Sequence, residues 1–172
     1  MSSSRKSLLA AILLWLPLAG CGFTPLYGDS GNTTVTQKLD NVEVENIPER
    51  TGQMLRLSLE TQLHTAGAPA AQLYALTVNY SIGVNGIGVE EDTATTRNRY
   101  IATATWTLAP IGRPSAPLTT GQASSQDAEN IIDQQYFAQI LETDTVNQQL
   151  ADIIAAQITT QVAAYFKTHP NS

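Results

Sequence analysis

Two ten-residue segments with strictly alternating side chains constrain the fold more than any other feature of this chain. In residues 73–82 every even position is apolar or aromatic, and the odd positions from 77 on are Thr, Asn and Ser. In residues 99–108 the even positions are again apolar, and the odd ones are three Thr beside Arg99 and Ile101. Successive side chains of a strand point to opposite faces, so both segments are predicted to be strands with one buried face and one polar face. The polar face is mostly neutral.

A short strand and a helix are predicted before these two strands. Residues 41–47 alternate Val with Glu and are followed by a proline, which favours a half-exposed strand. In residues 49–66 the period becomes helical, because Leu55, Leu59 and Leu63 recur at a spacing of four and share one face.

The rest of the chain completes an α+β domain that we place at residues 39–168. Residues 83–98, which contain several glycines, are expected to be a long hairpin connection, and residues 118–126 a weak edge strand. Residues 134–167 predict a long helix and leave open whether it is continuous or broken near 142–145. The order β-α-β-β-β-α predicts a mostly antiparallel or mixed four-stranded sheet with two helices packed on one face.

Residues 1–20 have the pattern of a secretory signal peptide rather than of a folded segment. Arg5 and Lys6 form a positive head, and nine of the ten residues 7–16 are apolar. A membrane-spanning helix needs about twenty such residues, so this segment is too short for a lasting transmembrane anchor.

The only cysteine of the chain follows directly. Leu18-Ala19-Gly20-Cys21 resembles the lipobox of bacterial lipoproteins, in which the cysteine thiol is joined to diacylglycerol and the chain is cut before it. We therefore predict lipidation at Cys21 and a permanent membrane anchor, since each buried methylene contributes roughly 0.8 kcal/mol. In such lipoproteins an aspartate after the cysteine often signals retention at the inner membrane. Gly22 stands there instead, which indicates the outer membrane.

A tether is predicted between this anchor and the domain. Residues 21–38 are rich in Gly, Thr, Pro and Ser and have no sustained periodicity. A segment of this composition is typical of a linker, so the domain would stand off the membrane on the periplasmic side.

The negative net charge argues against nucleic-acid binding, and the small number of histidines argues against catalysis. The chain has 9 Lys and Arg against 15 Asp and Glu, a formal net charge of -6, whereas affinity for nucleic acid comes from neutralising phosphates. The only histidines are His64 and His169, so neither a histidine-rich metal site nor a Ser/His/Asp centre is favoured. We expect no enzyme activity, no cofactor and no bound metal.

Two further motifs have structural explanations. Residues 83–88 contain three glycines, but a phosphate loop needs a helix after it, and a strand is predicted there. The run Glu90-Glu91-Asp92 has carboxylates that calcium prefers, but it lacks a calcium-loop pattern, so a solvated charge run is the preferred interpretation.

Arg97 and Arg99 are the candidate ligand-binding residues. Their spacing of two places them on the same face of a strand. With Arg56 or Arg113 nearby, they would hold the phosphates of an anionic lipid through bidentate hydrogen bonds. The alternative is a pair of surface arginines that balance the acidic run.

Residues 21–28, Cys-Gly-Phe-Thr-Pro-Leu-Tyr-Gly, closely resemble the start of the mature lipopolysaccharide-assembly lipoproteins, LptE, of Gram-negative bacteria. The later order is similar too: a helix after the first strand, a strand that begins Arg99-Tyr100, and a long C-terminal helix. The similarity covers most of residues 21–166.

The resemblance implies a noncatalytic protein that sits largely inside a large outer-membrane β-barrel, LptD. The pair delivers lipopolysaccharide to the outer leaflet, and the lipoprotein helps the barrel to assemble, plugs it and binds lipopolysaccharide. Two alternatives stay open from the residues alone. One is an accessory lipoprotein of another envelope assembly machine, and the other is a lipid- or glycan-binding periplasmic lipoprotein that acts alone.

Overall fold

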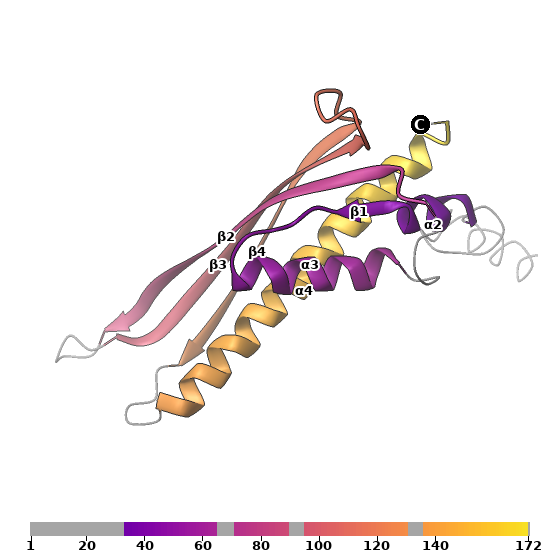
Figure 1. Ribbon diagram of the computed structural model, residues 1–172. Coiled ribbons are helices and arrows are strands. Elements are labelled where there is room, and N and C mark those ends of the chain that lie inside the picture. Colours follow the sequence, from indigo (N-terminus) through magenta and orange to yellow (C-terminus); the bar gives the residue numbers. More distant parts are fainter. Residues whose placement is uncertain (1–32, 65–70, 90–94, 131–135, 172) are drawn as a thin grey trace, which may run out of the picture.

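A computed structural model describes residues 33–64, 71–89, 95–130 and 136–171 (Figure 1). The predicted signal peptide, Cys21 and the run Glu90-Glu91-Asp92 lie outside these residues. The elements in chain order are α2 (Thr33–Asp40), β1 (Val42–Val44), α3 (Arg50–Leu63), β2 (Tyr74–Val89), β3 (Thr95–Pro110), β4 (Thr119–Asn130) and α4 (Tyr136–Thr168).

The four strands form one mixed sheet in the order β1-β2-β3-β4. β1 pairs with β2 in parallel, and the other two pairs are antiparallel. The helices lie on the same side of this sheet, and α4 runs along its length (Figure 1). The predicted α+β class, with a four-stranded sheet and helices packed on one face, is confirmed.

Helix α2 is an addition to the predicted order. It begins at Thr33, inside the segment that we expected to be tether, and carries only two buried apolar residues, Val35 and Leu39. Lys38 fixes it to the end of α4, because its Nζ donates to the carbonyl oxygens of His169, at 3.2 Å, and Pro170, at 2.8 Å.

The two central strands are longer than predicted. Most of residues 83–98, expected as a connection, belongs to β2 and β3, because the register continues without a break from Tyr74 opposite Pro110 to Ile87 opposite Arg97. Backbone pairing needs no side chain, so the glycines lower strand propensity without preventing the ladder. β4 also extends beyond the predicted segment, to Asn130.

Helix α4 is continuous over 33 residues, which answers the question that the sequence leaves open near residues 142–145. Thr145, one of the poor helix formers there, donates its hydroxyl to the carbonyl of Leu141 at 2.8 Å. Tertiary packing of the buried face of α4 outweighs this local weakness.

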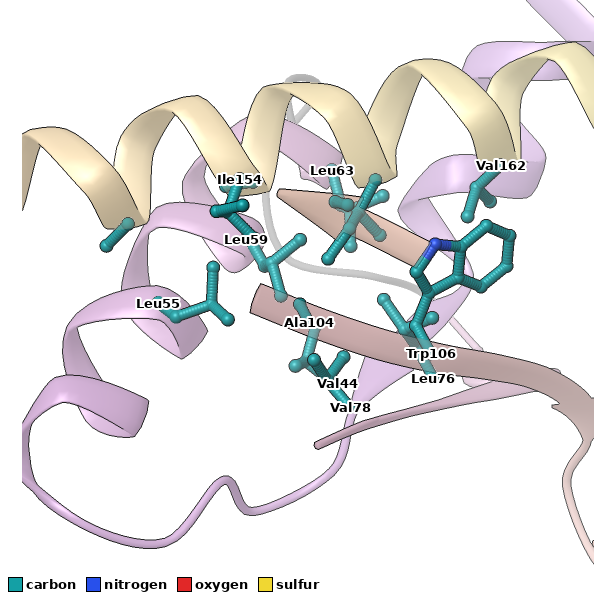
Figure 2. Packing of buried hydrophobic residues seen from close by; sticks show 14 of the residues in the cluster. Val44, Leu55, Leu59, Leu63, Leu76, Val78, Ala104, Trp106, Ile154 and Val162 are labelled. Carbon is teal, nitrogen blue, oxygen red and sulfur yellow. The ribbon is translucent and has the colours of Figure 1, made fainter. Parts of the chain in front are cut away.

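The even-numbered residues of the strands form the core beneath the helices, as the alternation predicts. All five even positions of β3 from Tyr100 to Leu108 are buried, and in β2 Tyr74, Leu76 and Val78 are buried too. They pack against α3 and α4 (Figure 2). The buried core residues of these two helices include Leu55, Leu59, Leu63, Leu150, Ile154, Ile158 and Val162.

Trp106 is the largest aromatic side chain of this core and depends on a glycine opposite it. Trp106 pairs with Gly121 in the register of β3 and β4. A Cβ atom on Gly121 would lie 2.5 Å from the indole ring and 2.8 Å from Oε1 of Gln161. The indole Nε1 donates to that same oxygen at 3.2 Å, so the ring is held on two sides.

We predict that Gly121→Ala destabilises the protein by about 1–3 kcal/mol, because the added methyl overpacks a fixed indole. Gly83→Ala is the matched control on β2, since the nearest atom to its Cβ would be a carbonyl oxygen at 4.0 Å. Urea unfolding followed by circular dichroism measures both. Equal stability of the two variants would contradict the packing described here.

Candidate functional site

The odd-numbered residues of β2 and β3 form a polar face that no described helix covers. Thr77, Asn79, Ser81, Thr103 and Thr105 are exposed there. The hydroxyls of Ser81 and Thr103 lie 3.0 Å apart and share a hydrogen bond across the two strands. This face, which we call the outer face, therefore offers neutral donors and acceptors over a wide area, as the alternation predicts.

The structure brings Arg97 and Arg99 together on the outer face. Both are exposed, and they lie at the end of the sheet where Ile87 and Asn130 flank Arg97 on the neighbouring strands. We call this the distal end. Neither guanidinium forms an ion pair with a described residue, and the acidic run of the alternative interpretation, Glu90-Glu91-Asp92, lies outside the described residues.

A shallow hollow of about 230 Å³ surrounds the two arginines. Its lining residues are Ile87, Arg97, Arg99, Gln126, Asp127 and Ala128. The hollow is therefore mixed in charge, with two guanidinium groups and one carboxylate. That carboxylate already accepts a hydrogen bond from the backbone N–H of Ala128 at 2.7 Å.

The other two arginines proposed as helpers lie elsewhere. Arg56 is on α3, on the helix side of the sheet, and pairs with Glu60 at 3.0 Å. Arg113 follows β3, at the end of the sheet opposite to the distal end. The cationic site of the described residues thus consists of Arg97 and Arg99.

Glu129 is a buried carboxyl group at the distal end that sequence reasoning missed. It is only 2% exposed. It accepts a hydrogen bond from the hydroxyl of Tyr100, and Thr143 Oγ1 lies 3.1 Å from each of its oxygens. These bonds tie β3, β4 and the first part of α4 together. The alternation of β4 could have revealed it. Odd-numbered residues of this strand face the core, and Glu129 shares that face with the buried Ala123.

Two glutamines of α4 cover the outer edge of β4, and these were also missed. Gln157 accepts from the backbone N–H of Ser124 and donates to its carbonyl, both at 3.2 Å. Gln161 donates to the carbonyl of Gln122 at 3.1 Å. The amide side chains thus pair with the strand as another strand would.

The histidines have structural partners. His64 caps the end of α3 and its Nε2 lies 2.9 Å from the carbonyl oxygen of Val42, while His169 stacks on Tyr165. Within the described ranges no three His, Cys, Asp or Glu side chains are grouped to hold a metal ion.

The glycine-containing residues 83–88 all belong to strand β2, and the next element along the chain is strand β3. A phosphate loop would need a helix at that point. None of the described helices has the length and apolar character needed to cross a bilayer.

Solved structures of bacterial lipoproteins share this fold. A lipoprotein from Caulobacter crescentus CB15 has 23% identity and a TM-score of 0.62, over 80% of this chain and 98% of that one. The minor lipoprotein from Acinetobacter baumannii has 17% identity and a TM-score of 0.56, over 72% and 90%. Rare lipoprotein B from Shewanella oneidensis has 9% identity and a TM-score of 0.55, over 76% and 97%.

No protein-family model matches the sequence, and no curated protein matches it. The similarity to the lipoproteins is therefore one of fold. It covers 98% of the Caulobacter crescentus chain and 97% of the Shewanella oneidensis chain, so the shared fold extends over nearly the whole of both.

We predict that Tyr100→Phe destabilises the protein by roughly 1.5–3 kcal/mol, because it removes a donor from a buried carboxyl group. Burial, and then the hydrogen bond to Glu129, raise the pKa of Tyr100 above its usual 10.0. The stabilisation that the protonated phenol contributes is therefore present in full below pH 10.0, and it is lost as the pH rises through the raised pKa of Tyr100. Urea unfolding at neutral and alkaline pH tests both effects. An unchanged midpoint and pH slope in the variant would contradict them.

Proposed function

We propose that the protein is an outer-membrane lipoprotein of the LptE type. It would be anchored through Cys21, and would assist and plug an LptD-like β-barrel that carries lipopolysaccharide to the outer leaflet. The observation that carries the proposal is the outer face, which is broad, mostly neutral and polar, and not covered by any described helix. The fold shared with envelope lipoproteins and the residues 21–28 support it.

A neutral polar face suits the inside of a large barrel. The lumen of such a barrel is polar and hydrated. Thr, Ser and Asn side chains exchange hydrogen bonds with that wall without burying unpaired charge, which would cost several kcal/mol per ion. The affinity would then come from a large, wet interface and not from a catalytic pocket.

Arg97 and Arg99 would supply the contact with lipopolysaccharide. Both side chains are exposed and line one hollow, and a guanidinium group matches phosphate in bidentate hydrogen bonds. At the two arginines, a solitary lipid-binding module fits less well. Small-molecule pockets usually enclose about 300–1,000 Å³ and bury most of their ligand, whereas this hollow is shallow and holds about 230 Å³.

The proposal is tested by purifying the tagged full-length protein from its native envelope in mild detergent and identifying the stoichiometric partners by mass spectrometry. We expect one large barrel in a one-to-one ratio, and it should be the lipopolysaccharide translocon. Recovery of a different assembly machine would favour the accessory alternative. Recovery of the lipoprotein alone would overturn the plug function.

A clean deletion gives an independent prediction. The amount of correctly folded barrel should fall, and the cells should become sensitive to large hydrophobic antibiotics. Immunoblotting of the folded barrel and antibiotic susceptibility measure the two effects. Cys21→Ser is the variant to compare with the deletion. It removes the thiol that would carry the lipid anchor and leaves the sequence of the domain unchanged. Normal barrel levels and intact permeability in the deletion would count against the proposal.

The lipid contact is tested separately with Arg97→Gln/Arg99→Gln. The double variant should bind immobilised lipopolysaccharide at least about tenfold more weakly, because a charge-assisted hydrogen bond contributes about 1.5–3 kcal/mol. Arg113→Glu is the control, since it lowers the net charge by the same two units at the opposite end of the sheet. Equal weakening by both variants would show a general charge effect and contradict the assignment.

A further inference from the structure

Among the described residues, most of the edge of β2 that faces away from β3 has no neighbouring strand. β1 is only three residues long and pairs with Tyr74, Ala75 and Leu76 alone. The last bond on this side runs from the N–H of Glu45 to the carbonyl of Leu76, at 3.0 Å. β2 continues to Val89, so residues 78–86 form an edge that we call the open edge (Figure 1).

The register identifies the backbone groups on the open edge. The carbonyl of Leu76 points to β1, and backbone direction alternates along a strand, so the even residues of β2 face outward. The N–H and C=O groups of Val78, Tyr80, Ile82 and Val84 therefore lie on the open edge. None of them has a hydrogen-bond partner within the described ranges, whereas the odd residues pair with β3.

The other edge of the same sheet is covered. On β4, Gln157 binds both backbone groups of Ser124, Gln161 binds the carbonyl of Gln122, and the Asp127 carboxylate takes the N–H of Ala128. Such cover is how proteins prevent unwanted strand pairing. The difference between the two edges indicates that the outward backbone groups of β2 are left available for pairing with another strand.

The sequence of the open edge also lacks the usual protection. Natural edge strands are commonly blunted by Lys, other charges or Pro. Residues 76–89 contain no charged residue and no proline. Val84, on the helix side, has 53% of its surface exposed, and glycines in this stretch permit close approach of another backbone.

We propose that the open edge binds an extended segment of the partner barrel by strand addition. This inference rests on the proposed function. The segment would place apolar side chains beside Ile82 and Val84, and neutral polar ones beside Asn79 and Asn85. A cation at one end would lie near Glu45, whose carboxylate accepts a bond from Thr77 at 2.7 Å. A second copy of this chain is disfavoured as the occupant, because each copy has a net charge of -6.

Proline substitution tests the edge without breaking the sheet. The N–H of Val84 faces the open edge, so Val84→Pro removes a donor for the added strand and keeps the bonds to β3. Thr120→Pro is the matched control, because it removes an outward N–H of β4 at the end remote from the arginines. Both full-length variants are purified from the native envelope in mild detergent, and the co-purified barrel is quantified.

We expect Val84→Pro to lower the recovered barrel at least tenfold while Thr120→Pro leaves it unchanged. Wild-type recovery with both variants overturns the inference and leaves the proposed function standing. If the unaltered protein recovers no barrel, the proposed function fails and the inference fails with it.

Amide exchange of the unaltered protein gives a readout that does not depend on how Val84→Pro folds. In the free protein the even amides from Val78 to Val84 should exchange fast, and the odd amides slowly. In the barrel complex the even amides should become protected. Unchanged exchange there overturns the inference, as does a photoreactive residue at Asn85 that links only to a second copy.

Discussion

The burial of one sheet face under two helices of unequal length determines the rest of this structure. Helix α4 has 33 residues and α3 has 14, while β2 and β3 have 16 each. At about 1.5 Å per helical residue and about 3.3 Å per strand residue, α4 and each of these strands are roughly 50 Å long, but α3 is only about 21 Å. A helix is about 10 Å wide and covers two strands. α4 therefore covers β3 and β4 along their length, and α3 covers only the first part of β2.

Polar contacts fix the short helix at that end of the sheet. Ser58 of α3 donates to the Asp152 carboxylate of α4 at 2.6 Å, and Gln148 binds both groups. Arg50 at the start of α3 pairs with Asp144 at 2.8 Å. β1 ends at Val44 and the chain turns into α3 at Arg50, so β2 has no described strand neighbour beyond Leu76. The open edge follows from how α3 is anchored and is not an isolated irregularity.

Strict alternation was enough to predict the sheet, its buried face and the placement of Arg97 and Arg99 on the opposite face, because side-chain parity is a local property. The extension of β2 through its glycines was not predictable. Hydrogen bonds to β3 stabilise this part of the strand, whereas the local strand propensity of the glycines is low. Helix α2 has two buried residues and depends on α4, so its period was too weak to detect. The pairing of Glu129 with Tyr100 and Thr143, and of Gln157 with the edge of β4, joins residues distant in sequence. Neither can be seen from spacing alone.

The distal end brings the two proposed contacts within reach of each other. Arg97 pairs with Ile87 of β2, and Arg99 pairs with Asn85, so the arginines lie one strand away from the open edge. Neighbouring strands are about 4.8 Å apart, which would place a segment added to β2 roughly 10 Å from β3. A lipid phosphate held by the arginines would then lie beside the added segment. The partner's backbone and the lipid headgroup would meet on one surface, beyond the part of β2 that α3 covers.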